Sequence, residues 1–251
     1  MVQLIKIFRM KNLFSFQKTF LLLCIGIALS AWKQSLPSVF LIGDSISMHY
    51  GPYLEKYLEG SIAFERKTDD GQAAKNLDVP VGPNGGDSRM VLAYLKIKVK
   101  EAGFQPDYVV LNCGLHDIKH NDSTGLNQVN KTEYRKNLSG IIEVLHKKKI
   151  DLIWIRTTAV VDSIHNKKPK GLRRYATDLA AYNAIADEVC AQNKIPEIDL
   201  YGFTKKLGIE QFIDHVHYNE KTRALQAAYL TGSLQNLVVD GAKSKGARGK
   251  N

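Results

Sequence analysis

Three short apolar runs constrain the fold of this 251-residue chain more than any other feature. They are SVFLI at 38–42, DYVVLNC at 107–113 and DLIWIRT at 151–157. Each has the length of a strand, and none alternates apolar with polar side chains, so both faces of each strand must be covered. Amphipathic segments lie between them, such as the helix expected over 132–147. This order predicts an α/β fold, a three-layer α/β/α sandwich with a central parallel five-stranded sheet.

The remaining expected elements are shorter or less regular. We expect strands over 61–65 and 196–199, and helices over 48–58, 88–102, 172–192, 203–212 and 222–238. Long polar loops fill 67–87, 115–130 and 159–171. In a parallel sheet, ligands bind beyond the carboxyl ends of the strands. Ser45, Gly114–Asp117 and Thr157–Val160 all follow strand ends, so we expect them to share one edge of the sheet.

The first strand runs directly into Gly43-Asp44-Ser45. A serine between a buried strand and a helix can be a nucleophile that is held at a cleft. Asp and Ser are also common N-terminal caps of helices. The stretch alone therefore leaves a catalytic and a capping interpretation open.

Three further polar motifs follow along the chain. NGGDS at 84–88 precedes an expected helix, and its glycines let backbone N–H groups approach a ligand closely. LNCGLHDIKH at 111–120 follows a strand end. Asp214 and His217 lie three residues apart before the last helix, where a histidine can take a serine proton and an aspartate can orient its ring. Each motif alone also fits an ordinary loop, and the combination is more informative than its parts.

In this order, GDS, NGG, GxxD and DxxH resemble the SGNH or GDSL hydrolase superfamily from residue 39 to about residue 237. The resemblance implies a flavodoxin-like fold and hydrolysis of esters or thioesters through an acyl-enzyme, without a metal or other cofactor. It implies that Ser45 is the nucleophile and that Asp214 and His217 are the acid and the base. It also implies that the backbone N–H groups of Ser45 and Gly86 stabilise the oxyanion.

One motif departs from the family pattern. The third block usually reads Gly-x-Asn-Asp, and its asparagine amide donates to the oxyanion, whereas this chain has Gly-Leu-His-Asp at 114–117. His116 can donate one N–H in place of the asparagine, and such a donor is worth about 3 kcal/mol in acyl transfer. Titration of the imidazole would make this donor pH-dependent. Asn112 is an alternative donor.

Other residues are expected to bind substrate or to support the site: Asp44, Asn84, Asp117 and His215. Of these, His215 is the main rival of His217 as base.

Two other classes of protein remain open. His116, His120, His215 and His217 lie on two loops, with neighbouring aspartates and spacings that a metal ion can use. A metal-dependent hydrolase would be inhibited by a chelator and would keep its activity after Ser45→Ala. A carbohydrate-binding relative that has lost catalysis would bind its ligand without turnover.

The loops expected around the cleft are polar, HDIKHNDSTGLNQ at 116–128 and VDSIHNKKPKGLRR at 161–174. They favour a small acyl group on a hydrophilic carrier, and the family resemblance implies a carbohydrate acetylesterase. We therefore expect a secreted serine esterase that acts on short acyl esters, acetyl above all, of a small molecule or polysaccharide. A lysophospholipase or thioesterase of the same fold is the alternative. The basic run at 167–174 could attract an anionic saccharide, but we expect it to be a solvated face.

Both ends of the chain are basic. Residues 1–30 combine a basic stretch, a short apolar run and the small residues Ala28–Ser30, which is typical of a secretory signal peptide. An uncleaved anchor is the alternative, but the run is short for a span of about 20 residues. We expect a secreted or periplasmic protein with a hydrolase domain over 31–240 and a disordered tail over 241–251. Each end has four basic residues and no acid, which leaves +2 of the formal +10 for the domain and argues against nucleic-acid binding.

Two cysteines remain in the expected domain. Cys113 ends an expected strand and Cys190 lies on an expected helix. A disulfide in an oxidising compartment and two buried free thiols both fit these positions. Neither cysteine has the CxxC spacing that is typical of a redox or zinc site.

Overall fold

The computed structural model describes residues 35–121, 123–167 and 173–239. The chain divides into two compact units, Met1–Leu36 and Pro37–Asn251, and the first lies almost wholly outside the described residues. The expected signal peptide and C-terminal tail also lie outside them, so both remain predictions. Within the described ranges, no helix is long and apolar enough to cross a membrane.

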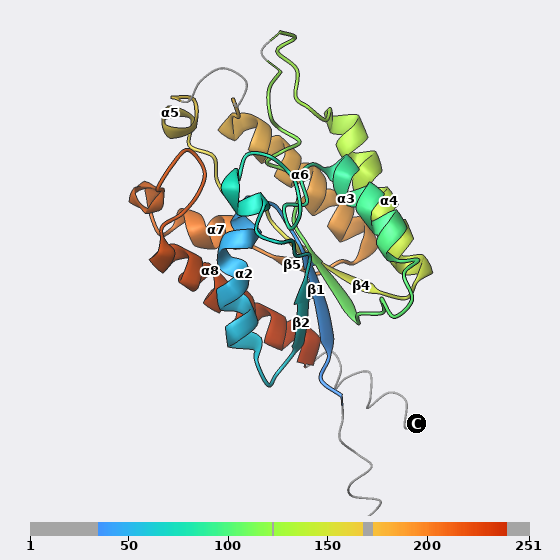
Figure 1. Cartoon of the computed structure of the whole chain (residues 1–251). Coiled ribbons are helices and arrows are strands. Elements are labelled where there is room, and N and C mark those ends of the chain that lie inside the picture. Colours follow the sequence, from blue (N-terminus) through green and yellow to red (C-terminus); the bar gives the residue numbers. More distant parts are fainter. Residues whose placement is uncertain (1–34, 122, 168–172, 240–251) are drawn as a thin grey trace, which may run out of the picture. The chain divides into compact units, whose positions relative to one another are not determined.

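A five-stranded sheet forms the centre of the second unit, with the strand order β2-β1-β3-β4-β5 (Figure 1). The strands are β1 (Ser38–Ile42), β2 (Ala63–Arg66), β3 (Tyr108–Leu111), β4 (Asp151–Ile155) and β5 (Glu197–Ile198). Every neighbouring pair is parallel. The three apolar runs of the sequence form the three central strands, where both faces of a strand are covered. The predicted fold class is therefore confirmed.

Helices cover both faces of this sheet. The α-helices are α2 (Ser45–Leu58), α3 (Ser88–Lys98), α4 (Lys131–Lys147), α5 (Asp162–His165), α6 (Ala176–Asn193), α7 (Leu200–Lys205) and α8 (Glu220–Leu234). Short helices of other types are η1 (Ala73–Lys75), η2 (Ile209–Gln211) and the π-helix η3 (Gln235–Val239). Helix α2 packs against α8, whereas α3 packs against α4 and α4 against α6, so two outer layers enclose the sheet (Figure 1).

The hydrophobic core lies along the central strands. Val109, Val110 and Leu111 of β3 have no exposed surface, and the four residues of β1 from Val39 to Ile42 are also buried. Full burial of one such side chain contributes about 1.5–3 kcal/mol. The strands are therefore held firmly, and the residues that directly follow them start from fixed positions. Cys113 and Cys190 belong to this core as buried free thiols, so the disulfide alternative is not realised.

Several element boundaries differ from those expected. Helix α2 begins at Ser45, three residues early, because the Asp44 side chain caps it. The single helix expected over 203–212 is split into α7 and η2, since Gly208 has a φ of +94° that no right-handed helix accommodates. The expected loop over 159–171 contains α5. The last α-helix begins at Glu220, because Asn219 caps it, and ends at Leu234, where η3 takes over.

Two glycines give opposite predictions for stability. A Cβ atom at Gly43 would lie 2.6 Å from the Cβ of Ser47, whereas one at Gly232, on the exposed side of α8, would meet nothing within 4 Å. We expect Gly43→Ala to lower the free energy of unfolding by about 1–3 kcal/mol through overpacking. Gly232→Ala should raise it by about 0.5–1 kcal/mol, because alanine is the better helix former. Urea unfolding followed by circular dichroism measures both, and a loss of stability in Gly232→Ala would contradict the steric account.

Candidate active site

Ser45 is the first residue of α2 and follows β1 after only two residues. The Asp44 carboxylate caps the helix by accepting the Ile46 N–H at 2.9 Å, and the Ser47 hydroxyl donates to the Asp44 carbonyl at 2.6 Å. The Ser45 side chain is therefore not needed for capping. The first N–H groups of a helix have no acceptor within it, and they lie at its positive end. The Ser45 N–H is such a group.

His217 joins Ser45 and Asp214 in a chain of hydrogen bonds. His217 Nε2 lies 2.8 Å from Ser45 Oγ, and His217 Nδ1 lies 2.8 Å from Asp214 Oδ2. The other carboxylate oxygen of Asp214 accepts the N–H groups of Val216 at 2.9 Å and His217 at 2.8 Å. Burial alone would raise the pKa of Asp214, but these hydrogen bonds hold that pKa well below its usual range. The ionised carboxylate can thus stabilise a positive charge on the His217 ring.

His215, the rival base, also lies beside the triad carboxylate, with Nδ1 3.5 Å from Asp214 Oδ1, but its Nε2 has another partner. Its Nε2 atom lies 3.1 Å from Asp78 Oδ1, and its ring is buried and packs at 4.8 Å against the ring of His165. His165 Nδ1 in turn lies 3.1 Å from the His215 carbonyl oxygen. Of the two neighbouring histidines, it is His217 that contacts Ser45. The structure therefore places His215 as a support between the loops that carry Asp78 and His165.

The NGGDS motif lies beside the GDS motif. The Gly85 N–H donates to the Gly43 carbonyl at 2.8 Å, and the Asn84 amide donates to the Leu77 carbonyl at 3.1 Å. Gly86 has a φ of +73°, which favours glycine, and its N–H donates to Asn84 Oδ1 at 3.1 Å. The N–H that was expected to face an oxyanion is therefore engaged in this structure. A substrate oxygen has to share it with Asn84 or displace that contact.

The proposed alternative oxyanion donor, Asn112, is used inside the protein. Its amide nitrogen donates to the Ile155 carbonyl at 2.8 Å and to the Thr157 hydroxyl at 3.1 Å. An amide has only two hydrogens to donate. The donor role considered for Asn112 is therefore wrong, and this side chain supports the site by joining the segments that follow β3 and β4.

His116 is buried on the loop after β3, next to the edge where Ser45 lies. Burial and the nearby Arg174 guanidinium lower the pKa of His116 to about 3. Its ring is therefore neutral at ordinary pH and has one N–H to donate. The expected pH dependence of this donor is corrected, because the ring does not titrate near its usual pKa.

Asp117 fastens the same loop to helix α3. It is fully buried, and its two carboxylate oxygens lie 3.0 and 3.1 Å from the backbone N of Ser88, the first residue of that helix. The Ser88 hydroxyl accepts a further hydrogen bond from Asn137 at 2.9 Å. Burial outweighs the hydrogen bonds that Asp117 accepts and raises the pKa of Asp117 to about 7. Asp117 is thus a structural support of the site.

Of the four histidines of the metal alternative, His215 and His217 lie beside one carboxylate, Asp214, at 3.5 and 2.8 Å, whereas His120 has another partner. His120 Nε2 lies 2.9 Å from Asp178 Oδ2, and its ring packs edge-on against Tyr175 at 4.7 Å. His217 contacts Ser45, and His215 contacts His165, as described above. Within the part of the chain that the structure describes, no three His, Cys, Asp or Glu side chains are grouped so that they could hold a metal ion.

Two residues near the site were missed by the sequence analysis. His49 lies one helical turn after Ser45, and its ring packs edge-on against the His217 ring at 5.0 Å. Burial, together with the charge of Arg223, lowers the pKa of His49 to about 4, so it stays neutral beside His217. Its i, i+4 spacing from Ser45 was the available signal. Arg174 was assigned to a solvated basic run, yet it is buried and its Nε donates to the Leu115 carbonyl at 2.5 Å.

The GDSL-like lipase/acylhydrolase family matches the chain over residues 41–225, and the chain therefore belongs to this family. No curated protein matches the chain at a significant level. Among solved structures, a lipase/acylhydrolase from Enterococcus faecalis has a TM-score of 0.60 and 20% identity, over 80% of this chain and 96% of that one. An acetyl xylan esterase has a TM-score of 0.58 and 19% identity, over 78% and 99% of the respective chains.

A third similar structure is a psychrotrophic esterase from Pseudoalteromonas, with a TM-score of 0.55 and 14% identity over 79% of this chain and 97% of that one. At these identities the likeness of the structures concerns the fold. The family match adds the reaction class: this protein is a carboxylic ester hydrolase. The expected family and enzyme class are both confirmed.

The raised pKa of Asp117 predicts a pH-dependent stability. Its pKa is about 7 in the folded protein against an ordinary value of 3.8, so the folded state binds more protons than the unfolded state between these values. The contribution of Asp117 to the free energy of unfolding therefore falls as the pH rises from about 4 to about 7. Asp117→Asn removes this titration, so the stability of the variant relative to wild type should improve from pH 4.5 to pH 8.

Urea unfolding at both pH values measures the difference, which we expect to be on the order of a few kcal/mol. Asp70→Asn, at an exposed position, is the matched control. A relative stability of Asp117→Asn that stays constant with pH, as in the control, would show that Asp117 is ionised throughout.

Proposed function

We propose that this protein is a serine esterase that removes short acyl groups, acetyl above all, from a hydrophilic carrier such as a carbohydrate. The observation that carries the assignment is the chain of hydrogen bonds from Ser45 through His217 to Asp214, with two contacts of 2.8 Å. A nucleophile, a base within hydrogen-bond reach and a third group that orients the base are the requirements for covalent catalysis of acyl transfer.

The reaction follows from these positions. Ser45 Oγ attacks the ester carbonyl carbon while His217 Nε2 takes its proton, and Asp214 stabilises the imidazolium that forms. The oxyanion is stabilised by the Ser45 N–H at the start of α2 and by the neutral ring of His116. The Gly86 N–H joins them when it leaves Asn84. His217 then protonates the leaving alcohol, and water, deprotonated by His217, releases the acid from the acyl-enzyme.

The preference for a short acyl group rests on the polar loops around the site. The loop after β3 carries Lys119, His120, Asn121, Thr124, Asn127 and Gln128, which are side chains that favour a hydrated carrier over an acyl chain. The similarity to an acetyl xylan esterase supports the same choice. We also propose that residues 1–30 are a secretory signal, which brings the enzyme to polysaccharides outside the cytoplasm.

A thioesterase or lysophospholipase is the second candidate, because exposed apolar side chains lie on two loops near the site. Val79 and Val81 lie on one of these loops and Ile213 on the other, and the contact between Asp78 and His215 joins the two loops. Such side chains would suit a longer acyl chain. The length of the acyl group therefore distinguishes the two candidates.

Hydrolysis of p-nitrophenyl acetate and p-nitrophenyl octanoate tests the proposal. We expect preference for acetate, no effect of EDTA, and a loss of about 10⁴-fold or more in kcat for Ser45→Ala. Ser139→Ala, on the exposed side of α4, is the matched control and should keep full activity. Full activity of Ser45→Ala, or inhibition by EDTA, would refute the serine mechanism, and a preference for octanoate would favour the second candidate.

The His116 position gives a separate prediction. His116→Ala removes one oxyanion donor and should lower kcat about 100-fold, whereas His116→Asn, which restores an N–H donor, should recover most of that loss. Because the pKa of His116 is about 3, the pH–kcat profile of His116→Asn should match that of wild type above pH 5. Equal activity of His116→Ala and wild type would remove His116 from the oxyanion site.

A further inference from the structure

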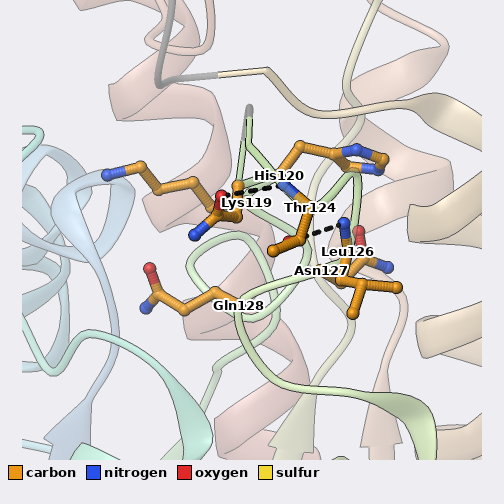
Figure 2. A pocket seen from close by; sticks show the side chains of 7 residues that line it. Lys119, His120, Thr124, Leu126, Asn127 and Gln128 are labelled. Carbon is orange, nitrogen blue, oxygen red and sulfur yellow. Dashed lines mark hydrogen bonds between the residues drawn. The ribbon is translucent and has the colours of Figure 1, made fainter.

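The loop between β3 and α4 forms a hairpin, described at 117–121 and 123–129, with a hollow of its own. The Val129 N–H donates to the Asp117 carbonyl at 3.0 Å, and the Gln128 N–H donates to the Lys119 carbonyl at 2.8 Å. His120 and Asn127 form an antiparallel bridge further along. The hollow has a volume of about 510 Å³ (Figure 2). Its described lining residues are Lys119, His120, Asn121, Thr124, Leu126, Asn127 and Gln128.

The hairpin is held in place on two sides. His120 contacts Asp178 through its ring at 2.9 Å, and its N–H donates to the Arg173 carbonyl at 2.8 Å. On the other side, the Gln128 amide donates to Asp87 Oδ2 at 2.8 Å. The walls of the hollow are thus formed before any ligand arrives. A preformed site saves the cost of ordering loops and side chains when a ligand binds.

The lining fits a ligand with many hydroxyl groups. It offers amides, a hydroxyl, an imidazole and an ammonium group, together with one apolar side chain, Leu126, which is 67% exposed. The side-chain oxygen of Asn127 is buried and accepts no hydrogen bond within the described residues. A sugar supplies hydroxyl groups for the polar side chains that line the hollow and C–H faces for the leucine. An acyl chain would desolvate the same polar groups without replacing their hydrogen bonds.

The hairpin that carries the hollow is bonded to the segment that follows Gly86, one of the expected oxyanion donors. Gln128 is bonded to Asp87, the residue after Gly86, and the hairpin begins at Asp117, the residue after His116. Figure 2 shows the Lys119 and Gln128 side chains extending to one side of the hairpin, whereas the His120 ring and Leu126 lie on the other. The hairpin therefore begins beside the proposed oxyanion donor His116 and extends away from it.

We propose that this hollow is the carrier subsite, which binds sugar units of an oligosaccharide while the acylated unit lies at Ser45. The inference rests on the proposed esterase function and adds a location and a ligand class to it. Specificity for the carrier then comes from the part of the β3–α4 loop that follows His116, the proposed oxyanion donor.

The test compares a substrate that has a carrier with one that has none. Wild type, Leu126→Ser and Asn127→Ala are assayed on acetylated xylotetraose, acetylated cellotetraose and p-nitrophenyl acetate. We expect the ratio of kcat/KM between the better tetrasaccharide and p-nitrophenyl acetate to fall about fivefold in each variant, the usual effect of one lost neutral contact. Ile97→Ser on α3 is the matched control, since Ile97 is 68% exposed and Leu126 67%, and its ratio should equal that of wild type.

Direct binding gives a second readout. Unesterified xylotetraose and cellotetraose are titrated calorimetrically into the full chain carrying Ser45→Ala, with and without Leu126→Ser, whose exposed position tolerates the change. We expect binding of at least one tetrasaccharide and a several-fold weaker affinity with Leu126→Ser. Unchanged ratios in both variants overturn the carrier subsite, as does a wild type that cleaves p-nitrophenyl acetate but neither tetrasaccharide. A wild type that fails on p-nitrophenyl acetate as well instead overturns the proposed function.

Discussion

The parallel pairing of β1 with β3 is the constraint on which the rest of the structure depends. The two strands end in register, with Ile42 opposite Leu111, so the residues that follow leave the sheet at the same edge. The Asn112 N–H extends the ladder to the Ile42 carbonyl at 3.0 Å. A shift in register by one residue would move the polar residues that follow the two strands out of alignment and turn their side chains to opposite faces. The hydrophobic core thus determines where Ser45 and His116 lie.

The electrostatics of the site follow from burial more than from charge pairing. Burial lowers the pKa of His49 and His116 to about 4 and 3, so both rings stay neutral, and the His49 ring packs against that of His217. Asp214 is the exception, because three hydrogen bonds keep it ionised although it is partly buried. Two carboxyl groups, those of Asp117 and Asp214, thus have pKa values that their surroundings shift in opposite directions.

The sequence was sufficient for the elements with clear apolar patterns. Strand β1 was predicted to the residue and α4 was one residue off at its start, because β1 is a continuous apolar run and α4 has apolar residues at helical spacing. The motifs that contact one another in the structure were also recognisable, since strand ends converge at one edge. Arg174 and His49 could not be found this way. In the sequence, a buried arginine within a basic run cannot be distinguished from a solvated one. The role of a histidine on a helix becomes clear only from the ring that packs against it.

The boundaries of helices and strands and the partners of hydrogen bonds could be found only from the structure, for a related reason. Asn84 engages the Gly86 N–H at 3.1 Å, and Ile155 and Thr157 engage the two Asn112 amide hydrogens at 2.8 and 3.1 Å. Such contacts depend on atomic positions that the sequence does not specify. Residue types and spacing do not contain this information. They indicate which groups can donate, whereas the fold decides which of them are still available to a substrate.

The two thiols in the core have a practical consequence. Cys113 and Cys190 are unpaired and buried, and burial raises the pKa of both thiols, so neither is a ready nucleophile. Folding of this domain therefore waits for no oxidation step. The same native structure can form in a reducing or an oxidising environment, and a preparation can be kept with or without a thiol reductant without altering the fold.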